Sequence, residues 1–183
     1  MVKNDEWIRK MSGKGGMIEP FEPGQARDGV ISYGVSSYGY DFRLSETFLV
    51  PVIGANEAID PKNTAGASYE QVETSCFALA PGTCVLGKSV EYFRIPRDVL
   101  GLCTGKSTYA RCGVLINITP LEPEWEGVVT ISIANTSAAP VRLYANEGIA
   151  QVIFIAAESV CKTSYADRKG KYQGQKEIGK AKI

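Results

Sequence analysis

The stretch CFALAPGTCVLGKSVEYFRIPRDVLGLCT, residues 76–104, decides the fold. Turn-forming residues divide it into short apolar or alternating segments, at Pro81-Gly82, Gly87-Lys88 and Pro96-Arg97-Asp98. Short segments of this kind, bounded by proline and glycine, are typical of β-strands. We therefore expect strands at residues 76–80, 83–86, 89–95 and 99–104.

The same pattern continues on both sides of this stretch. Further strands are expected at residues 35–44, 47–53, 113–118, 128–135, 141–144 and 149–155, and a long loop at residues 55–69. Many short strands at near-regular spacing indicate a mainly β protein, built as a sandwich, a jelly roll or a barrel.

The two ends of the chain differ from this body. Residues 5–11 are expected to form a short helix capped by Asn4 or Asp5, and the glycines make residues 12–16 a flexible break. Residues 165–183 are basic and poor in large aliphatic side chains, so we expect a tail that orders on a ligand or a neighbouring subunit. A length of 183 residues fits a single domain, 1–183, that includes both ends.

Composition narrows the classes of function. The chain has 20 basic and 20 acidic residues, so broad capture of nucleic acid or of an anionic membrane is not expected. It has no histidine, the commonest general base and metal ligand, and its 5 cysteines include no C-x-x-C pair. We expect no zinc site and no metal bound by the protein itself. The thiols are expected to be reduced in a cytoplasmic protein without a signal peptide or membrane span.

The segment GKSTYARCG, residues 105–113, concentrates two cations and two hydroxyls between glycines. It is not a Walker A motif, because three residues rather than four separate Gly101 from Gly105. A polar helical turn between strands is the plainer interpretation. On such a turn Ser107 and Arg111 face the same way, and Arg111 suits a phosphate or a carbonyl oxygen, so a polyanionic ligand is the functional interpretation.

The segment TPLEPEWEG, residues 119–127, places three carboxylates around Trp125. It is either a solvated rigid loop or a platform on which a sugar or base packs against the tryptophan. In the strand that follows, alternation puts Val129, Ile131 and Ile133 on one face and Thr130, Ser132 and Ala134 on the other. The second face is small and polar, as a ligand pocket or a crowded subunit interface requires.

Together these segments resemble the dCTP deaminases of the trimeric, zinc-free kind, which are related to the dUTPases. The resemblance rests on residues 105–111, 119–127, 144–151 (YANEGIAQ) and 170–175 (GKYQGQ) with Tyr165, and on 39–44 (GYDFRL). It implies a mainly β, distorted jelly-roll fold of the dUTPase type with a short N-terminal helix and few other short helices. It also implies a homotrimer with active sites between subunits.

The activity implied is hydrolysis of dCTP to dUTP and ammonia, within pyrimidine deoxynucleotide metabolism and the supply of dTTP. Magnesium would be carried on the triphosphate, and dCTP, dUTP and dTTP are the nucleotides that the site would meet. Regulation by dTTP and further hydrolysis of dUTP stay open.

The resemblance assigns roles to individual residues. Those that would contact the triphosphate and base are Lys106, Ser107, Thr108, Tyr109, Ala110 and Arg111, and of these Ser107 and Arg111 would orient water and polarise the cytosine. Trp125 would border the deoxyribose, and Thr130, Ile131 and Ser132 would line the base pocket. The base edge and the phosphates would be held by Gln151, Tyr165, Lys171 and Gln175, with the tail closing over the ligand.

Ser132 departs from the family pattern, which has a glutamate there as the proton shuttle. A serine hydroxyl does not take up a proton near neutral pH, and losing a general base typically lowers a rate by about 100- to 10,000-fold. Three explanations stay open: another residue serves as base, the protein binds nucleotide with little or no turnover, or the chain is altered or its strand shifted. A dUTPase-like diphosphohydrolase using Glu122 or Glu124 is a further alternative.

Overall fold

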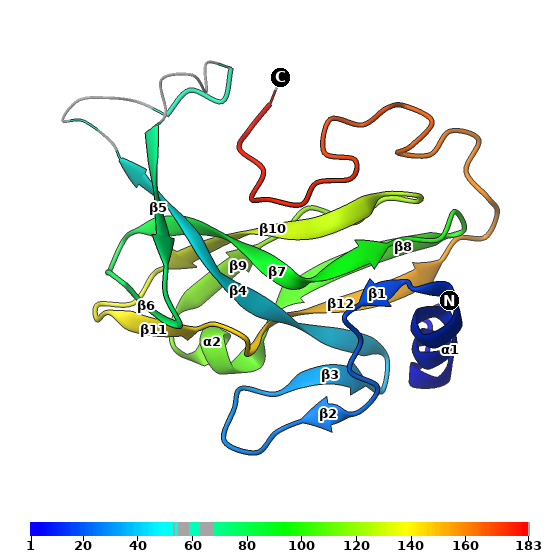
Figure 1. Cartoon of the computed structure of the whole chain (residues 1–183), viewed down its shortest axis with the longest axis horizontal. Coiled ribbons are helices and arrows are strands. Elements are labelled where there is room, and N and C mark those ends of the chain that lie inside the picture. The colour runs from blue at the N-terminus through cyan, green and yellow to red at the C-terminus, as the bar shows by residue number, and fades with distance from the viewer. Residues whose placement is uncertain (53, 55–58, 63–67, 183) are drawn as a thin grey trace.

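The computed structural model of the chain describes residues 1–52, 54, 59–62 and 68–182. Part of the expected loop, residues 55–58 and 63–67, lies outside them. Figure 1 shows the elements. In chain order they are α1 (Asp5–Gly15), β1 (Ile18–Glu19), β2 (Gln25–Ala26), β3 (Tyr33–Ser36), β4 (Gly39–Val52), β5 (Ser68–Glu73), β6 (Cys76–Leu79), β7 (Cys84–Arg94), β8 (Val99–Gly105), α2 (Ser107–Arg111), β9 (Val114–Asn117), β10 (Glu126–Asn135), β11 (Val141–Tyr144) and β12 (Gly148–Ala156).

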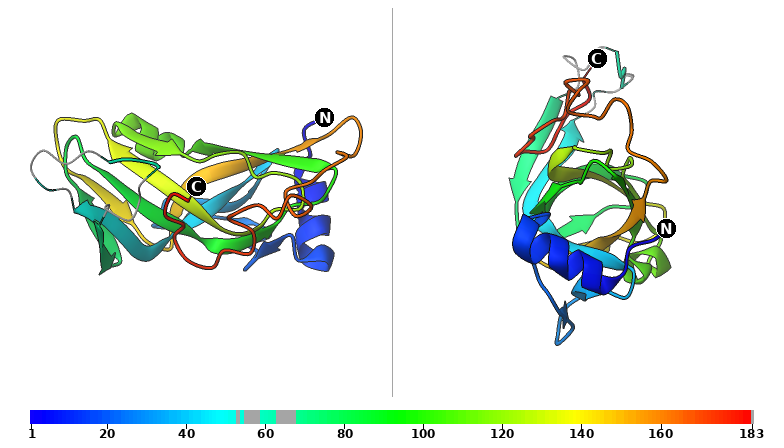
Figure 2. Two further views of the ribbon diagram at one scale, coloured as in Figure 1. Left: turned by 90° about the horizontal axis from the view of Figure 1, so that it is seen from above. Right: turned by 90° about the vertical axis from the view of Figure 1, so that its right-hand side faces the viewer.

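Antiparallel pairing joins ten of these strands into one sheet that curls around the core (Figure 2). The main path runs β2-β3-β4-β7-β10-β9, and β12 connects β4 to β8. Strands β6 and β11 pair with each other separately. Fully buried aromatic and aliphatic side chains fill the inside, among them Phe42, Phe48, Phe93, Ile131 and Phe154. The predicted mainly β fold with short helices is confirmed.

Two predicted breaks between strands are wrong: residues 45–46 lie inside β4, and residues 87–88 lie inside β7. Residues 83–86 and 89–95 belong to one strand, β7, and Gly87 lies inside it. A Cβ atom at Gly87 would stand 2.8 Å from Cδ1 of Leu44, so this glycine allows a close approach between strands instead of a turn. Conversely, the segment expected as one strand at 35–44 contains a hairpin, because β3 ends at Ser36 and β4 starts at Gly39.

The N-terminal helix is longer than predicted. The Asn4 side chain caps it by accepting from the Trp7 backbone N–H, as expected. The helix then continues through most of the residues predicted to be a flexible break and ends at Gly15. The next residue, Gly16, caps it in a left-handed conformation (φ 60°) and donates its N–H to the Ser12 carbonyl (3.1 Å). A second backbone hydrogen bond, from Met17 N–H to the Met11 carbonyl (3.3 Å), closes the end of the helix.

Strand β4 changes partners along its length, and a buried ion pair lies at the change. Its first half pairs with β3 and β12, and its second half with β5 and β7, with a register shift between Leu44 and Phe48. At this place the carboxylate of Glu91, on β7, accepts both the backbone N–H of Arg43 (2.9 Å) and its Nε–H (2.8 Å). Glu91 therefore satisfies a backbone donor of β4 that is not bonded to a neighbouring strand.

Glu91 gives a prediction about stability and pH. Burial raises the pKa of the Glu91 carboxyl above that of an exposed glutamate. The folded protein therefore keeps the Glu91 carboxyl protonated to a higher pH than the unfolded chain does. As a result, the contribution of Glu91 to the free energy of unfolding is complete below the ordinary glutamate pKa. It falls as the pH rises through the raised pKa of the folded protein. Glu91→Gln replaces one of the two accepting oxygens with an N–H donor, which leaves one N–H of Arg43 without an acceptor, and should lower the free energy of unfolding by about 1–3 kcal/mol.

Urea denaturation over a pH series measures this effect. The stability difference between wild type and Glu91→Gln should shrink as pH rises from about 4 upward. Glu19→Gln is the matched control, because Glu19 pairs with Arg94 at the surface and should contribute at most about 1 kcal/mol. A difference that grows with pH would contradict the assignment.

Candidate functional site

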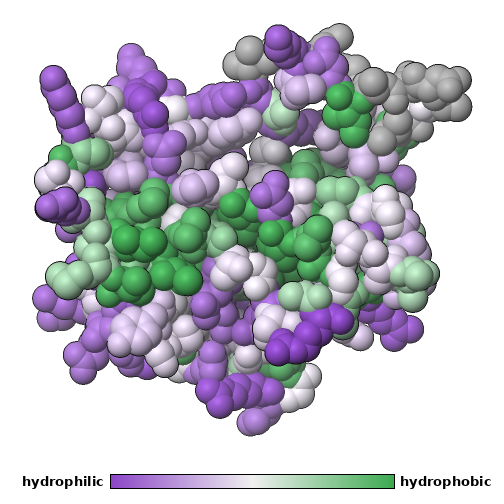
Figure 3. All heavy atoms as spheres, turned by 180° about the vertical axis from the view of Figure 1, so that it is seen from behind, coloured by the Kyte–Doolittle hydropathy of each residue, from purple (hydrophilic) through white to green (hydrophobic). Residues whose placement is uncertain are grey.

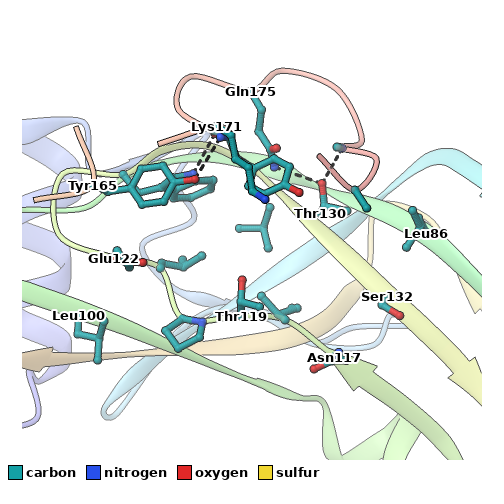
Figure 4. A pocket seen from close by; sticks show the side chains of 18 of the residues that line it. Leu86, Leu100, Asn117, Thr119, Glu122, Thr130, Ser132, Tyr165, Lys171 and Gln175 are labelled. Atoms are coloured by element: carbon teal, nitrogen blue, oxygen red, sulfur yellow. Dashed lines mark hydrogen bonds between the residues drawn. The ribbon is translucent and has the colours of Figure 1, made fainter. Parts of the chain in front are cut away.

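A cavity of about 900 Å³ lies between β10, the segment that follows β9, and the C-terminal tail (Figure 4). Its lining combines four aromatic rings with hydroxyl, amide and ammonium groups. Those residues are Tyr69, Trp125, Tyr165 and Tyr172, and Asn117, Thr119, Thr130, Ser132, Lys171 and Gln175. Aromatic walls with a few polar groups are the usual composition of a small-molecule site.

The tail forms the roof of this cavity. The indole N–H of Trp125, only 6% exposed, donates to the Tyr172 carbonyl (3.1 Å). The Gln175 side chain donates to the Val128 carbonyl (2.6 Å) and to the Thr130 hydroxyl (3.2 Å), which also accepts the Gly179 N–H (2.8 Å). The tail is therefore held on β10 by hydrogen bonds within a single chain.

Gly127 allows this close contact between tail and strand. It has φ 150°, and a Cβ there would stand 3.0 Å from the carbonyl oxygen of Gln175. Backbone hydrogen bonds run on both sides of it, from Val128 N–H to the Gln175 carbonyl (2.9 Å) and from Gly174 N–H to the Glu126 carbonyl (2.9 Å). Any larger residue at 127 would push the tail away from β10.

The carboxylates around Trp125 are mostly engaged elsewhere. Glu124 pairs with Arg97, whose second nitrogen bonds Asp167 (2.7 Å). The Arg97 guanidinium lowers the pKa of the Asp167 carboxyl to about 2. Glu122 pairs with the half-exposed Arg168 and is the one carboxylate among the described residues that line the cavity. The segment around Trp125 is thus held by two arginine–carboxylate contacts to the tail region, Arg97–Asp167 and Arg168–Glu122.

The polar face of β10 is placed as the alternation predicts. Ile131 and Ile133 are completely buried, whereas Thr130 and Ser132 line the cavity. Figure 4 shows Ser132 and Asn117 at one end of the cavity, away from Glu122. The Ser132 hydroxyl lies 3.3 Å from the Cys84 thiol. Hydroxyl, thiol and amide groups surround this end, and none of them is an ionised carboxylate.

The predicted helical turn exists as α2. The Arg111 guanidinium donates to the Ser107 carbonyl (2.9 Å), so the two residues do lie on one side of the turn. Ser107, Thr108, Ala110 and Arg111 are exposed. Tyr109 is different: it is 2% exposed, and its hydroxyl accepts the Tyr144 backbone N–H. Burial raises the pKa of Tyr109 to about 12.

A second polar cluster joins two of the predicted residues through one that the sequence analysis missed. The buried carboxylate of Asp41 accepts the Lys106 ammonium (2.6 Å) and the Gln151 amide (3.1 Å). Gln25 donates to it as well (3.1 Å). The signal in the sequence was a lone acid between aromatic residues, Tyr40 and Phe42, in a strand predicted to be buried.

One chain does not bring all the predicted site residues together. Six of them line the cavity: Trp125, Thr130, Ser132, Tyr165, Lys171 and Gln175. None of residues 106–111 does so, nor does Gln151, and the side chain of Ile131 lies in the core. Figures 1 and 2 show α2 and the tail on different sides of the curled sheet.

Comparison with known proteins identifies the relatives of this arrangement. The family model described as dCTP deaminase-like matches residues 2–157. The chain belongs to the dCTP deaminase-like family. The resemblance seen in the motifs is thereby confirmed.

Individual relatives match over nearly the whole chain. A dCTP deaminase of Methylococcus capsulatus is 55% identical over 178 residues, which cover 95% of each chain. A dCTP deaminase of Nautilia profundicola is 53% identical over 183 residues, 100% of this chain and 98% of the relative. The crystal structure of a 2′-deoxycytidine 5′-triphosphate deaminase from Agrobacterium tumefaciens superposes with a TM-score of 0.65 at 14% identity. That match covers 85% of this chain and 48% of the other, and it shows a shared fold.

Within residues 1–52, 54, 59–62 and 68–182, no three cysteine or acidic side chains gather as a metal-binding group. None of the helices in the same residues is long and apolar enough to cross a membrane.

Trp125 offers a direct test of the roof. A chain that stops after Ser164 lacks the Tyr172 carbonyl and the tail that shields the indole, so Trp125 becomes exposed. In a Trp7→Phe background, which leaves Trp125 as the single tryptophan, its fluorescence emission should shift to longer wavelength. Unchanged emission would show that the tail does not cover the cavity in solution.

Proposed function

We propose that this protein is an enzyme that hydrolyses dCTP to dUTP and ammonia, in the cytoplasm and in the supply of deoxyuridine nucleotides. The observation that carries the proposal is the roofed cavity, lined by residues of the family motifs in a chain that dCTP deaminases match end to end. In the reaction, water adds at C4 of the cytosine, and the C4–N bond breaks as the amino group leaves with a proton taken from water.

The cavity would hold the nucleoside part of dCTP. Trp125 offers a flat wall for the deoxyribose, and Thr130, Ser132 and the backbone of Ile131 form the polar edge of the base pocket. From the tail, Tyr165, Lys171 and Gln175 close the site, and Lys171 adds a cation for the phosphates. Magnesium would enter with the triphosphate, as it commonly does in nucleotide sites.

The triphosphate would lie on α2 of a neighbouring subunit in a homotrimer. Lys106, Ser107, Thr108 and Arg111 present cations and hydroxyls there, and the exposed backbone of Tyr109 and Ala110 completes the turn. In this arrangement Ser107 and Arg111 would orient the water and polarise the cytosine carbonyl. The separation of α2 from the cavity within one chain supports a site shared by two subunits.

The outer face of β8 and β12 supports such an assembly. Strand register pairs Leu102 with Ile153 and Leu100 with Ile155 on this face, and Leu102 is 45% exposed. The opposite face of the same strands carries buried Val99 and other core residues. Figure 3 shows the apolar surface across the back of the molecule. Contiguous exposed apolar surface is typical of a contact with another chain.

A nucleotide-binding protein with little turnover is the second candidate function. The environment of Ser132 favours it, because the neighbouring group is the Cys84 thiol and not a carboxylate. Glu124 is engaged by Arg97. Glu122 lines the cavity, and it is one of the two residues, with Glu124, that the dUTPase-like diphosphohydrolase alternative would use.

Ammonia release from dCTP distinguishes these functions. The proposal predicts slow, magnesium-dependent release at high protein concentration. Ser132→Glu supplies a general base and should raise the rate by about 100-fold or more. Ser132→Gln, of similar size but without a titrating group, is the matched control. Nucleotide binding without any ammonia from either wild type or Ser132→Glu would reject the deaminase, and pyrophosphate from dUTP would favour the diphosphohydrolase.

The proposed assembly is tested separately. Leu102→Asp puts a charge on the apolar face, where burial without a partner is costly, so the trimer should dissociate. Val160→Asp is the control, because Val160 is 57% exposed in the segment after β12. Light scattering coupled to size exclusion should give a trimer for wild type and Val160→Asp and a smaller species for Leu102→Asp. A monomeric wild type would contradict the shared site.

A further inference from the structure

Asp41 is the centre of a polar cluster that includes Lys106, and Asp41 itself has no role so far in the proposed reaction. It lies on β4 between β3 and β12, opposite Gly34 on one side and Gln151 on the other, and it is 3% exposed. A carboxylate this deeply buried is costly unless its oxygens are bonded. Three side chains meet that need: Gln25, Lys106 and Gln151 donate to it, at 3.1, 2.6 and 3.1 Å.

The contact with Lys106 fixes the direction of an ammonium group. The Lys106 side chain is only 12% exposed, and its Nζ lies 2.6 Å from the Asp41 carboxylate. An ammonium has three donors. No other described protein group accepts from this one, so two donors stay available to a ligand.

The same lysine begins α2, so its backbone is fixed as well. Its N–H donates to the Ile149 carbonyl (3.0 Å), and its carbonyl accepts from Ala110 N–H (3.0 Å), which closes the helical turn. Lys106 is thus held at the backbone by β12 and α2 and at the ammonium by Asp41. Flexible lysine side chains lose much conformational entropy when a ligand orders them, and this one is ordered beforehand.

We propose that Asp41 is a positioning residue for phosphate recognition: it holds the Lys106 ammonium in place so that its two remaining donors face the phosphate chain of the nucleotide. This inference rests on the proposed function, in which α2 binds the triphosphate. The negative charge of Asp41 partly cancels that of Lys106, so the pair contributes geometry, while the exposed Arg111 supplies the net positive charge.

Asp41→Asn tests this inference because it keeps the size of the side chain and removes its charge. If positioning dominates, the dissociation constant of magnesium-dCTP measured by calorimetry should rise about tenfold or more, as for loss of one charged hydrogen bond. Binding of dCMP, which lacks the outer phosphates, should change by less than about threefold. Adding Lys106→Met to Asp41→Asn should weaken dCTP binding no further, because the two residues act together.

Glu91→Gln is the matched control, since it changes the other buried carboxylate, which pairs with Arg43. It should lower stability and leave the affinity for dCTP unchanged. Tighter dCTP binding by Asp41→Asn would overturn the inference by showing that charge repulsion outweighs positioning. Equal losses for dCTP and dCMP would assign Asp41 a purely structural role.

Chemical labelling of Lys106 separates this inference from the proposed function. The full-length protein is treated with acetic anhydride, and the labelling of Lys106 is measured by mass spectrometry after digestion. Lys106 should be labelled slowly in wild type and at least about tenfold faster in Asp41→Asn, because loss of the carboxylate releases the ammonium group. Equal labelling would overturn the inference whatever the protein binds. If Lys106 is labelled slowly in a wild-type protein that does not bind dCTP, the inference about Asp41 stands and the proposed function is contradicted.

Discussion

The pair formed by Arg43 and Glu91 is the interaction on which the curled sheet depends. A strand of 14 residues, β4, belongs to both halves of the sheet, and it exchanges one set of partners for another near Leu44. At such a change a backbone donor loses its partner strand, and an unbonded donor in a core is costly. Glu91 supplies the missing acceptor and also neutralises the arginine beside it. The bend in β4 places Asp41 on one side of the molecule and the cavity-forming strands β7 and β10 on the other.

This division separates the predicted site residues into two sets within one chain. The cavity gathers around Trp125 and the tail, whereas the cationic turn α2 lies across the sheet. The residues of the cavity and those of α2 can contact the same ligand molecule only if a second subunit brings its α2 to the cavity. The apolar outer face of β8 and β12 gives a physical reason for such a neighbour, because exposed Leu102 and its strand partner Ile153 gain stability when they leave water.

Much of the fold was predictable from local patterns, and the misses have local reasons. Alternation located β10 and its polar face correctly, and the turn at residues 106–111 followed from composition. Gly87 was misassigned because a glycine that permits close packing looks like a glycine that permits a turn. The end of α1 was missed because glycine has a low helix propensity, whereas here Gly13 and Gly15 belong to the helix and Gly16 caps it.

The candidate site was predictable in part for similar reasons. Residues such as Trp125, Thr130 and Gln175 follow from motifs that are local in sequence, and they do meet. Asp41 was missed because its partners, Gln25, Lys106 and Gln151, come from three distant segments that only the register of β3, β4 and β12 brings together. Side-chain surroundings such as the thiol beside Ser132 likewise depend on the pairing of β7 with β10.

A crystal structure with magnesium-dCTP bound tests the central claim most directly. We predict that the cytosine and deoxyribose lie in the cavity between Trp125 and Ser132 of one subunit, and that the phosphates contact Lys106 and Arg111 of another. A nucleotide bound by a single subunit, or one whose phosphates leave α2 untouched, would contradict this account.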